Sequence, residues 1–376
     1  MYKMSKALII SGDSLSDKTG GGIYLRGITD GIKEEFESTV LVCKTSGGII
    51  AERYRKVKIY GLNRHLLSDV FARMFLQASF LVVHLPFILK VIISEKPNVV
   101  YIHGTKHGLV VWFISSVIKI KVILVSDNIE LVLFKELYKK ENGFFGKIKL
   151  LVDLCCVKIS EKLSVDNATV ISFITSDDMK LAKEIYGFHQ RSLVWPVTIY
   201  DDTQLEIKNR SSYALFTGSF RFQPNVDAVN ELYELLKDTP CKVIIAGLSA
   251  SKLNIDLPEN FGIVCSPNDD DMRKLFEEAL FFVSLVRFGS GMKTKVAEAL
   301  KFGLPVFGTK HSFIGYEEIF DSGLIYTMKD SSSFFDFINS IKDNREDISR
   351  LAYITYKKYY SEVRSKKCAK LSFSMS

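Results

Sequence analysis

The stretch of sequence that decides the fold is residues 280–308, which read LFFVSLVRFGSGMKTKVAEALKFGLPVFG. The apolar run Leu280–Val286 predicts a buried strand. A glycine turn follows it, and then a helix that ends at Gly303 before the next strand. A glycine turn between a strand and a helix N-terminus leaves backbone N–H groups and the positive end of the helix dipole facing outward. Because glycine lets a ligand approach the backbone closely, this stretch predicts an anion-binding loop in a parallel α/β sheet.

The alternation of apolar runs and helical segments extends over most of the chain and restarts near its middle. A chain of 376 residues is long for one core, so two domains are expected. Residues 198–211 are polar and lack periodicity, which favours an interdomain linker. We therefore predict an N-terminal domain over 1–197 and a C-terminal domain over 212–346, both α/β with parallel sheets. A last helix over 347–376 is expected to pack back on the N-terminal domain.

The composition indicates a globular protein and disfavours some classes of partner. The chain is 47% hydrophobic and 25% charged, with a net charge of +7, which is typical of a globular protein. Basic residues can serve phosphates, nucleic acid or an anionic membrane, but they are spread along the chain, so nucleic acid is not expected. The six cysteines show no CxxC spacing, which favours reduced thiols in a cytoplasmic protein and disfavours a zinc site. No signal peptide is recognised at the start of the sequence.

A second glycine-rich segment follows the first predicted strand. Residues 6–10 form that strand, the loop Ser11–Gly22 ends in Gly20-Gly21-Gly22, and a helix is expected from Ile23. The spacing is looser than a dinucleotide-binding fingerprint, so alone it is weak evidence for a phosphate site. A flexible surface loop is an equally good interpretation.

A long apolar region covers Val70–Ile93, and charged residues that include Arg73 and Lys90 interrupt it. Its uninterrupted part is shorter than the roughly 20 residues that a membrane-spanning helix needs. It could be a buried helix, or a helix that lies on a membrane with Arg73 and Lys90 at the headgroups. We favour burial.

Polar residues follow two further predicted strands. The strand over 98–103 ends at His103, and the strand over 122–126 leads into Asp127-Asn128-Ile129-Glu130. The carboxyl ends of parallel strands are where open α/β sheets bind ligands. Asp127 and Glu130 could equally cap a helix, and a histidine at a strand end is more often structural than catalytic.

These motifs, in this order, resemble the retaining GT-B glycosyltransferases of family 4, the glycosyl transferases group 1 kind. Gly289–Ala299 with Gly303–Val306 is similar to the family's "GsGi.tKvlEAla.G.PVv", and the part over Lys293–Val306 is the most specific. The other matching segments are Leu215–Ser219 with Pro224–Ala228, Asp127–Glu130, and Ile171–Ser172 with Asp177.

The resemblance implies two Rossmann-like domains that face a central cleft, and transfer of a sugar from a nucleotide-diphosphate sugar, UDP-, GDP- or dTDP-linked. The acceptor would be a glycan, lipid-linked or of a surface polysaccharide. The reaction would keep the anomeric configuration, use no metal or cofactor, and take place in the cytoplasm, with peripheral contact at the inner face of the membrane.

The resemblance also implies roles for individual residues. The Gly289–Thr294 backbone and Lys293 or Lys295 would face the diphosphate, and Lys295 matches the family's lysine three residues before the glutamate. Glu298 would accept hydrogen bonds from the ribose. Asp127 and His103 are the catalytic candidates, and Asn128 and Glu130 the acceptor-binding ones. The full donor-binding set is Gly21, Gly22, Gly218, Arg221, Gly289, Ser290, Gly291, Met292, Lys293, Thr294, Lys295 and Glu298. The nucleotide base is expected near Val264–Pro267.

Two departures from the family pattern define the alternatives. The family's E-x7-E pair would place its first glutamate at Ser290, yet residues 280–295 contain no Glu. Asp127 stands where the family has histidine, and His103 and His107 are candidate substitutes. The alternatives to a transferase are therefore a catalytically degenerate GT-B subunit that binds or activates a partner, and a GT-B sugar-nucleotide epimerase.

Overall fold

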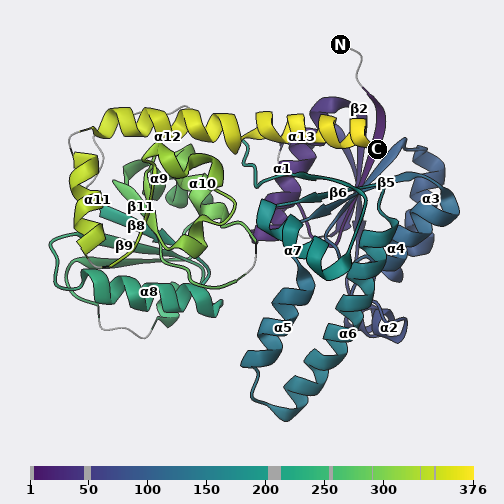
Figure 1. Cartoon of the computed structure of the whole chain (residues 1–376), viewed down its shortest axis with the longest axis horizontal. Coiled ribbons are helices and arrows are strands. Elements are labelled where there is room, and N and C mark those ends of the chain that lie inside the picture. Colours follow the sequence, from purple (N-terminus) through teal and green to yellow (C-terminus); the bar gives the residue numbers. More distant parts are fainter. Residues whose placement is uncertain are drawn as a thin grey trace. The chain divides into compact units, whose positions relative to one another are not determined.

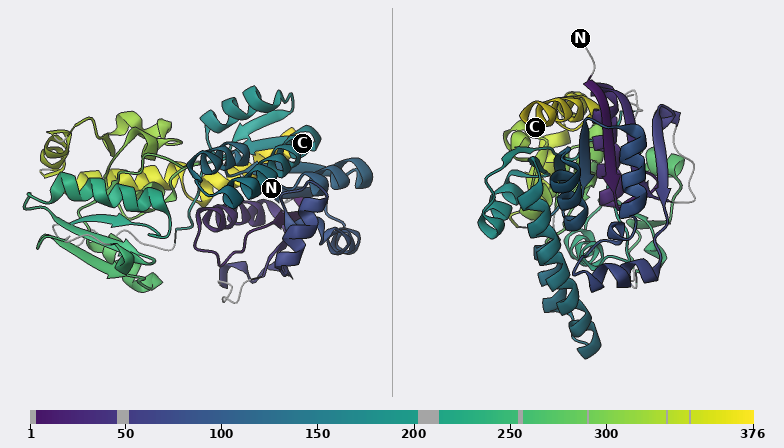
Figure 2. Two further views of the ribbon diagram at one scale, coloured as in Figure 1. Left: turned by 90° about the horizontal axis from the view of Figure 1, so that it is seen from below. Right: turned by 90° about the vertical axis from the view of Figure 1, so that its right-hand side faces the viewer.

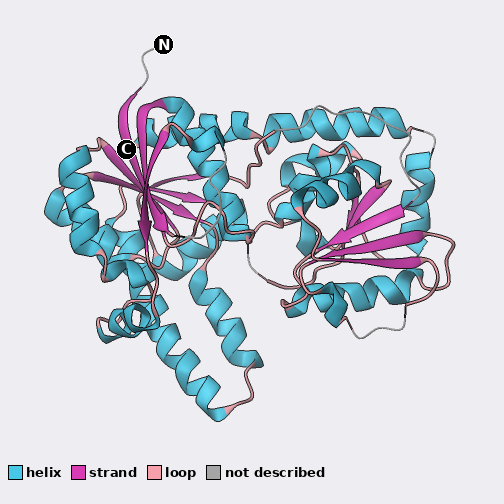
Figure 3. Ribbon diagram, turned by 180° about the vertical axis from the view of Figure 1, so that it is seen from behind, coloured by secondary structure: helices cyan, strands magenta, loops and turns pink. Residues whose placement is uncertain are grey.

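The computed structural model describes residues 4–45, 52–201, 213–253, 257–289, 291–330, 332–342 and 344–376. The chain divides into two units, Met1–Tyr200 with Glu362–Ser376 (unit 1) and Asp201–Ser361 (unit 2) (Figures 1 and 3). Most of the expected linker, from residue 202 onward, lies outside the described residues. The expected last helix, 347–376, is divided: α12 (Arg345–Tyr359) belongs to unit 2 and α13 (Glu362–Met375) to unit 1.

Unit 1 is built on a seven-stranded parallel sheet in the order β3-β2-β1-β4-β5-β6-β7. Its apolar core includes Leu8 on β1, Val40 on β2 and Val100 on β4, which are all fully buried. Leu8 is in register with both Val40 and Val100, so the three side chains form one row across the sheet. The strands are β1 (Met4–Ser11), β2 (Phe36–Lys44), β3 (Val57–Leu62), β4 (Val99–His103), β5 (Lys121–Ser126), β6 (Val170–Phe173) and β7 (Arg191–Val194).

Helices cover both faces of this sheet (Figures 1 and 3). α13 packs closely on α1, where the Ser365 hydroxyl donates to the Gly27 carbonyl at 2.7 Å. A Cβ on Gly31 would lie 2.3 Å from Ser365 Oγ, so the glycines of α1 allow this close helix contact. The other helices are α1 (Gly20–Glu35), α2 (Leu66–Met74), α3 (Leu85–Glu95), α4 (Gly108–Trp112), α5 (Glu130–Lys140), α6 (Phe144–Asn167) and α7 (Ser176–Tyr186).

Two expectations for unit 1 are wrong in part. The run Gly20-Gly21-Gly22 is the first turn of α1, because Thr19 caps the helix and its side chain accepts from the Gly22 N–H at 3.3 Å. The apolar region over 70–93 is not one buried helix: it contains the end of α2, a short 3₁₀ turn and α3. Several of its large apolar side chains are exposed. Within the described residues, no helix combines the length and the apolar character that crossing a membrane requires.

Unit 2 is built on a six-stranded parallel sheet in the order β10-β9-β8-β11-β12-β13. Its core includes Val283 on β11 and Phe307 on β12, which are in register and fully buried. The strands are β8 (Tyr213–Thr217), β9 (Lys242–Gly247), β10 (Phe261–Cys265), β11 (Phe281–Ser284), β12 (Val306–Gly308) and β13 (Ile325–Thr327). The helices are α8 (Gln223–Leu236), α9 (Asp269–Glu278), α10 (Thr294–Lys301), α11 (Ser332–Lys342) and α12.

In both sheets, the order in which strands are added along the chain reverses after the third strand. In unit 1 the chain moves outward from β1 to β3 and then returns to place β4 on the other side of β1. In unit 2 the pair β8 and β11 has the same relation. At such a topological switch point, the loops that leave the carboxyl ends of the two central strands diverge, and ligands bind there in open α/β sheets.

Candidate functional site

The glycine loop of unit 2 follows β11 at the switch point. Gly289 and Gly291 have φ angles of +105° and +71°, which favour glycine because a Cβ is strained in this region. The Gly289 carbonyl accepts from Lys293 Nζ and from His311 Nε2, each at 2.8 Å. Lys293 Nζ also donates to the Gly291 carbonyl at 3.1 Å. Lys293 therefore stabilises the shape of the loop. Ser290 lies outside the described residues.

Tyr316 connects this loop to α10. Its hydroxyl accepts from the Ala297 N–H at 2.9 Å and donates to the Lys293 carbonyl at 2.7 Å. Burial raises the pKa of Tyr316, so the hydroxyl stays protonated and can donate. Lys293 is the N-cap residue of α10 and gives the helix no side-chain cap hydrogen bond. First-turn N–H groups lack intrahelical acceptors, so this helix end has the polarity of an anion site.

Lys295 and Glu298 lie one turn apart on the same face of α10. Lys295 Nζ and Glu298 Oε2 are 2.6 Å apart, and the two side chains are 32% and 24% exposed. Both can therefore be reached from solvent. An ammonium group suits a phosphate, and a carboxylate can accept hydrogen bonds from two neighbouring hydroxyls. Thr294 begins the helix, whereas Met292 is buried and packs in the interior.

The loop after β8 adjoins the glycine loop. A Cβ on Gly289 would lie 3.7 Å from the Phe222 ring, which brings the two loops of the switch point together. A Cβ on Gly247 would lie 1.9 Å from the Gly218 carbonyl, so the turns that end β8 and β9 are packed against each other. Arg221 is exposed, and its Nε donates to Ser249 Oγ at 3.1 Å.

A different cluster lies at the carboxyl ends of the strands in unit 1. Asp13 follows β1, His103 ends β4 and Asp127 follows β5. His103 Nδ1 lies 2.9 Å from Ser11 Oγ and 3.6 Å from Asp13 Oδ2, and His103 Nε2 lies 3.9 Å from Asp127 Oδ2. Sequence reasoning selected His103 and Asp127 but missed Asp13 and Ser11. Asp13 could have been found by the same rule, because it is a polar residue just past a parallel strand.

This cluster contains buried polar atoms that have no hydrogen-bond partner among the described residues. Within the part of the chain that the structure describes, His103 Nε2 and Asp127 Oδ1 are buried and make no hydrogen bond. Burial raises the pKa of Asp127. Buried polar atoms in proteins are nearly always hydrogen-bonded, so these two atoms mark a place for a ligand or a water molecule.

His107 has a structural role beside the cluster. Burial lowers its pKa to about 3, so the ring is neutral. Its Nε2 lies 3.0 Å from the His103 carbonyl and its Nδ1 lies 2.7 Å from Ser79 Oγ. Because a carbonyl only accepts, Nε2 carries the proton and Nδ1 accepts from Ser79. The ring therefore holds the turn that follows β4 in place.

Glu161 on α6 is the main support of the 127–131 segment. Its carboxylate accepts from the N–H groups of Glu130 and Leu131, each at 2.9 Å, and from the hydroxyls of Thr105 and Tyr186, each at 2.5 Å. It is fully buried. Glu161 thus caps α5 from another helix. No sequence motif points to Glu161, because its hydrogen-bond partners are distant in the sequence.

The two acceptor candidates differ in their surroundings. The carboxylate of Glu130 lies 3.0 Å from Lys106 Nζ and is buried, and the same ion pair raises the pKa of Lys106. Asn128 has its Oδ1 buried without a hydrogen-bond partner among the described residues. Gly21 lies against the cluster of Asp13, His103 and Asp127, since a Cβ on it would lie 2.8 Å from Asp13 Oδ2. Gly22 lies against the preceding loop in the same way, with its Cβ position 2.2 Å from the Asp17 carbonyl.

Asp13, His103 and Asp127 also form the group of metal-ligating side chains that the described residues bring together, with ligand atoms within 4.8 Å of one another. The cluster therefore has the donor set of a cation site as well as that of an acid–base pair. The acidic run Asp269–Asp271 is not part of this group. It forms the first turn of α9, where Asn268 Oδ1 accepts from the Asp271 N–H at 2.8 Å.

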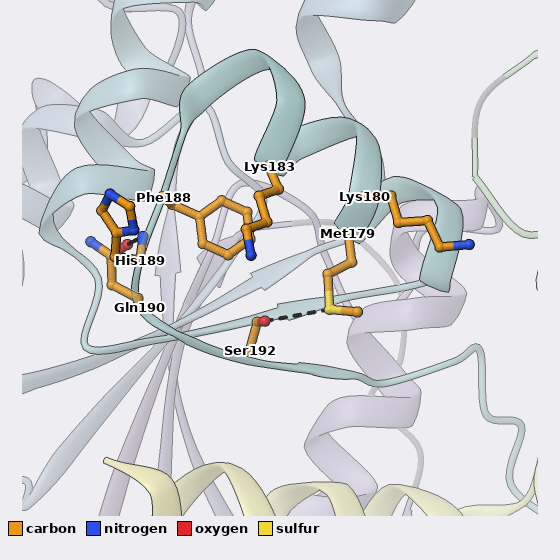
Figure 4. Close-up of a pocket in the computed structure, with 7 residues that line it drawn as sticks. All are labelled: Met179, Lys180, Lys183, Phe188, His189, Gln190 and Ser192. Atoms are coloured by element: carbon orange, nitrogen blue, oxygen red, sulfur yellow. Dashed lines mark hydrogen bonds between the residues drawn. The ribbon is translucent and has the colours of Figure 1, made fainter.

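A shallow pocket lies elsewhere in unit 1, between α7 and β7 (Figure 4). Its volume is about 360 Å³, and Ser192 Oγ and Met179 Sδ are 3.4 Å apart across it. It contains none of the predicted site residues. The lining residues are Met179, Lys180, Lys183, Phe188, His189, Gln190 and Ser192.

Comparison with known protein families gives a match in unit 2. Residues 200–358 match the family described as Glycosyl transferases group 1. An uncharacterized 44.6 kDa protein in the cps region of Klebsiella pneumoniae is 23% identical over 189 residues, which are 46% of this chain and 47% of that protein. The chain thus spans about half the length of this relative.

Comparison with solved structures identifies the fold of the whole chain. Sucrose-phosphate synthase (tll1590) from Thermosynechococcus elongatus aligns with a TM-score of 0.68 at 11% identity over 99% of each chain. Anabaena Alr3699/HepE, solved in complex with UDP-glucose, aligns with a TM-score of 0.67 at 11% identity over 98% of this chain and 99% of that one. The predicted α/β class with two parallel sheets is confirmed, and the fold is GT-B.

Proposed function

We propose that this protein is a glycosyltransferase that moves a sugar from a nucleotide-diphosphate sugar to a glycan acceptor, with retention of anomeric configuration and without a metal. The observation that carries the proposal is the glycine loop of unit 2 followed by Lys295 and Glu298. This loop lies at a switch point, it has the polarity of an anion site, and it falls inside the segment that matches the glycosyl transferases group 1 family.

The donor nucleotide would occupy the loops of unit 2. The backbone over 289–294 and the Lys295 ammonium would bind the diphosphate, and Glu298 would accept hydrogen bonds from the ribose hydroxyls. Gly218 and Arg221 lie on the neighbouring loop, where Arg221 would add positive charge. The base would lie near Val264–Pro267, at the carboxyl end of β10. The bound UDP-glucose of the Anabaena protein supports a nucleotide sugar as the donor class.

The chemistry of the departing group accounts for these residues. When the bond between the sugar and the diphosphate breaks, negative charge accumulates on the nucleoside diphosphate. Fixed N–H groups, a helix N-terminus and lysine ammonium groups stabilise that charge without reorganisation. A loop that His311 and Lys293 already hold in shape provides this preorganisation.

The acceptor side of the reaction would lie in unit 1. Asp127 and His103 are the groups that would exchange a proton with the acceptor hydroxyl, and their partnerless atoms, Asp127 Oδ1 and His103 Nε2, support this. Asn128, whose Oδ1 is likewise without a partner among the described residues, would orient the acceptor. Glu130, which is paired with Lys106, would also bind the acceptor. Gly21 and Gly22 would let the donor approach the start of α1.

The proposal is tested with Lys295→Ala and Glu298→Ala, assayed for transfer from UDP-, GDP- and dTDP-sugars. Each variant should lose about a hundredfold or more in kcat/KM, as expected for groups that stabilise developing charge. Unit 2 offers a matched control: Glu234 and Lys237 on α8 form an ion pair with the same three-residue spacing at 2.7 Å. Glu234→Ala and Lys237→Ala should leave the rate unchanged. Equal rates in all four variants would remove the assignment.

A degenerate subunit is the second candidate, because residues 280–295 lack the family's first glutamate. Titration calorimetry with nucleoside diphosphates separates the two, since a transferase should bind one of them and a degenerate subunit none. An epimerase would convert the donor with no acceptor present, which product analysis shows. Activity that survives chelation by EDTA would support a metal-independent reaction, whereas its loss would point to the Asp13, His103 and Asp127 donor set.

A further inference from the structure

Large apolar side chains are exposed on two neighbouring elements of unit 1. The first is α2 with the two residues after it, and the second is the α5–α6 hairpin, which projects from the rest of unit 1 (Figures 1 and 2). Apolar patches of this kind on a soluble surface mark a binding site. We call the two elements together the apolar ridge. Its exposed large apolar side chains are Leu66, Leu67, Val70, Phe71, Met74, Phe75, Leu76, Leu137, Phe144, Phe145, Ile148, Leu151, Val152 and Ile159.

The amphipathic pattern of α2 is reversed relative to an ordinary surface helix. Leu67, Phe71 and Met74 are 70%, 51% and 72% exposed, whereas Ser68 and Ala72 on the opposite side are buried. A surface helix normally turns its apolar face to the core and its polar face to water. This helix therefore turns its apolar face away from its own domain.

α6 carries a matching stripe. Phe145, Ile148, Val152 and Ile159 follow helical spacing along one face and are all exposed, with Phe145 at 84%. The opposite face, which includes Val157 and Glu161, is buried against unit 1. α6 is thus anchored by one face and presents the other.

The two elements are held together by an ion pair. Arg73 on α2 donates through Nε to Asp153 on α6 at 2.8 Å, and Asp153 is buried. This ion pair places two opposite charges between the helices, where they neutralise each other. The pairing also gives the ridge a fixed geometry on the anchored face of α6.

The tip of the hairpin is basic. Between residues 139 and 149, exposed lysines occur at Lys139, Lys140, Lys147 and Lys149, and the acidic residue in this interval is Glu141, which caps the Gly143 N–H at 2.7 Å. Two phenylalanines at the centre of the tip are thus surrounded by lysines. Long basic side chains can bury their stems beside apolar groups and keep their ammonium groups at a charged surface.

We propose that the apolar ridge inserts into the surface of a bilayer that contains anionic lipid. Apolar side chains flanked by lysines match the boundary between acyl chains and anionic headgroups. A surface made for a second copy of this chain would meet the same lysines and repel them, which argues against self-association. The inference is independent of the proposed reaction, although it would bring a lipid-linked acceptor to the enzyme.

The first test is co-sedimentation of the full chain with vesicles of phosphatidylcholine alone and of phosphatidylcholine with an equal amount of phosphatidylglycerol. Binding should occur on the mixed vesicles and weaken as salt is raised. Phe144→Ser with Phe145→Ser should weaken it about tenfold or more, and Lys147→Gln with Lys149→Gln by a similar factor. Phe320→Ser with Phe335→Ser, exposed phenylalanines of unit 2, is the matched control and should bind as the wild type does.

A second measurement reports insertion directly. Tryptophan fluorescence of Phe145→Trp should shift to the blue on mixed vesicles, beyond the change that the native tryptophans show in the wild type. No binding, equal binding to both kinds of vesicle, or equal binding by both phenylalanine double variants would overturn the proposal. So would sedimentation that shows a dimer in the wild type and a monomer in Phe144→Ser with Phe145→Ser, because a second copy would then cover the ridge.

Discussion

The two switch points have the same topology and opposite chemistry. In unit 1, the loops after β1, β4 and β5 bring a buried histidine between two carboxylates, which are 37% and 17% exposed. In unit 2, the loops after β8 and β11 bring glycines, an exposed arginine and a helix N-terminus with two lysines beside it. The shared strand order decides where a ligand can bind, and the side chains decide what it is.

The difference suggests a division of labour. Fixed positive charge and open N–H groups suit a group that is an anion throughout the reaction. A buried carboxylate with a raised pKa, next to a histidine, suits a group that gains or loses a proton. If the division is real, variants at the two switch points should affect different steps.

The largest effect is expected at Asp127. Asp127→Asn should lower kcat about a hundredfold to a thousandfold, as removal of a general base does, and leave nucleoside diphosphate binding unchanged. Asp166→Asn, on an exposed carboxylate in the last turn of α6, is the control. Steady-state rates and calorimetry measure the two quantities. If Asp127→Asn lost nucleotide binding as well, the two switch points would not be separate in function.

A loss of stability is expected at Glu161. Glu161→Ala leaves two backbone N–H groups and two hydroxyls without their acceptor, which should lower the free energy of unfolding by about 3 kcal/mol. Glu136→Ala, on the exposed side of α5, should change it by less than about 0.5 kcal/mol. Urea unfolding of both variants compares them. Equal free energies of unfolding in the two variants would mean that the Glu161 hydrogen bonds contribute little to stability.

A smaller effect is expected at the glycine loop. Gly289→Ala and Gly187→Ala both place a Cβ at a positive φ, +105° and +62°, and each should cost about 1–2 kcal/mol. Gly187 ends α7 and a Cβ there would meet nothing within 4 Å. Gly289→Ala alone should weaken nucleotide binding, by about tenfold, since it alters the anion loop. A parallel loss in Gly187→Ala would mean that binding follows stability and not the loop.

The smallest effect concerns pH. Because burial raises the pKa of Asp127, its protonated form is favoured in the native state, and native stability falls as pH rises through that pKa. Asp127→Asn removes this loss. The free energy of unfolding of the variant, relative to that of the wild type, should therefore increase as pH rises, by about 1.4 kcal/mol per unit of pKa difference. Urea unfolding from about pH 4 to about pH 8 covers this range. A difference that does not change with pH would contradict the raised pKa.

The sequence was most informative where a function depends on a continuous segment. The glycine turn, the lysines and Glu298 lie within ten residues, and helical spacing alone places Lys295 and Glu298 on one face. The same rule for strand ends found His103 and Asp127. The expectation of a glycine loop over Gly20–Gly22 was wrong, because Thr19 caps α1 and these glycines form its first turn. Glycine lowers helix propensity but does not exclude a residue from a helix.

The sequence was least informative about α2. Its apolar residues were expected to be buried, because hydrophobic periodicity identifies the apolar face of a helix and does not tell which way that face points. Packing fixed the direction: Ser68 and Ala72 fit against unit 1 and the apolar face remained outside.

By itself, the sequence determined the order of strands and helices, the α/β class and the glycine loop between β11 and α10, since each follows from local periodicity and local turn chemistry. Tertiary structure alone decided that Asp13, His103 and Asp127 meet, that Glu161 caps a helix 31 residues before it in the chain, and that the apolar ridge faces outward. The physical reason is that these contacts join strand ends and helix faces that are far apart in sequence, so they exist only once the sheet order has brought them together.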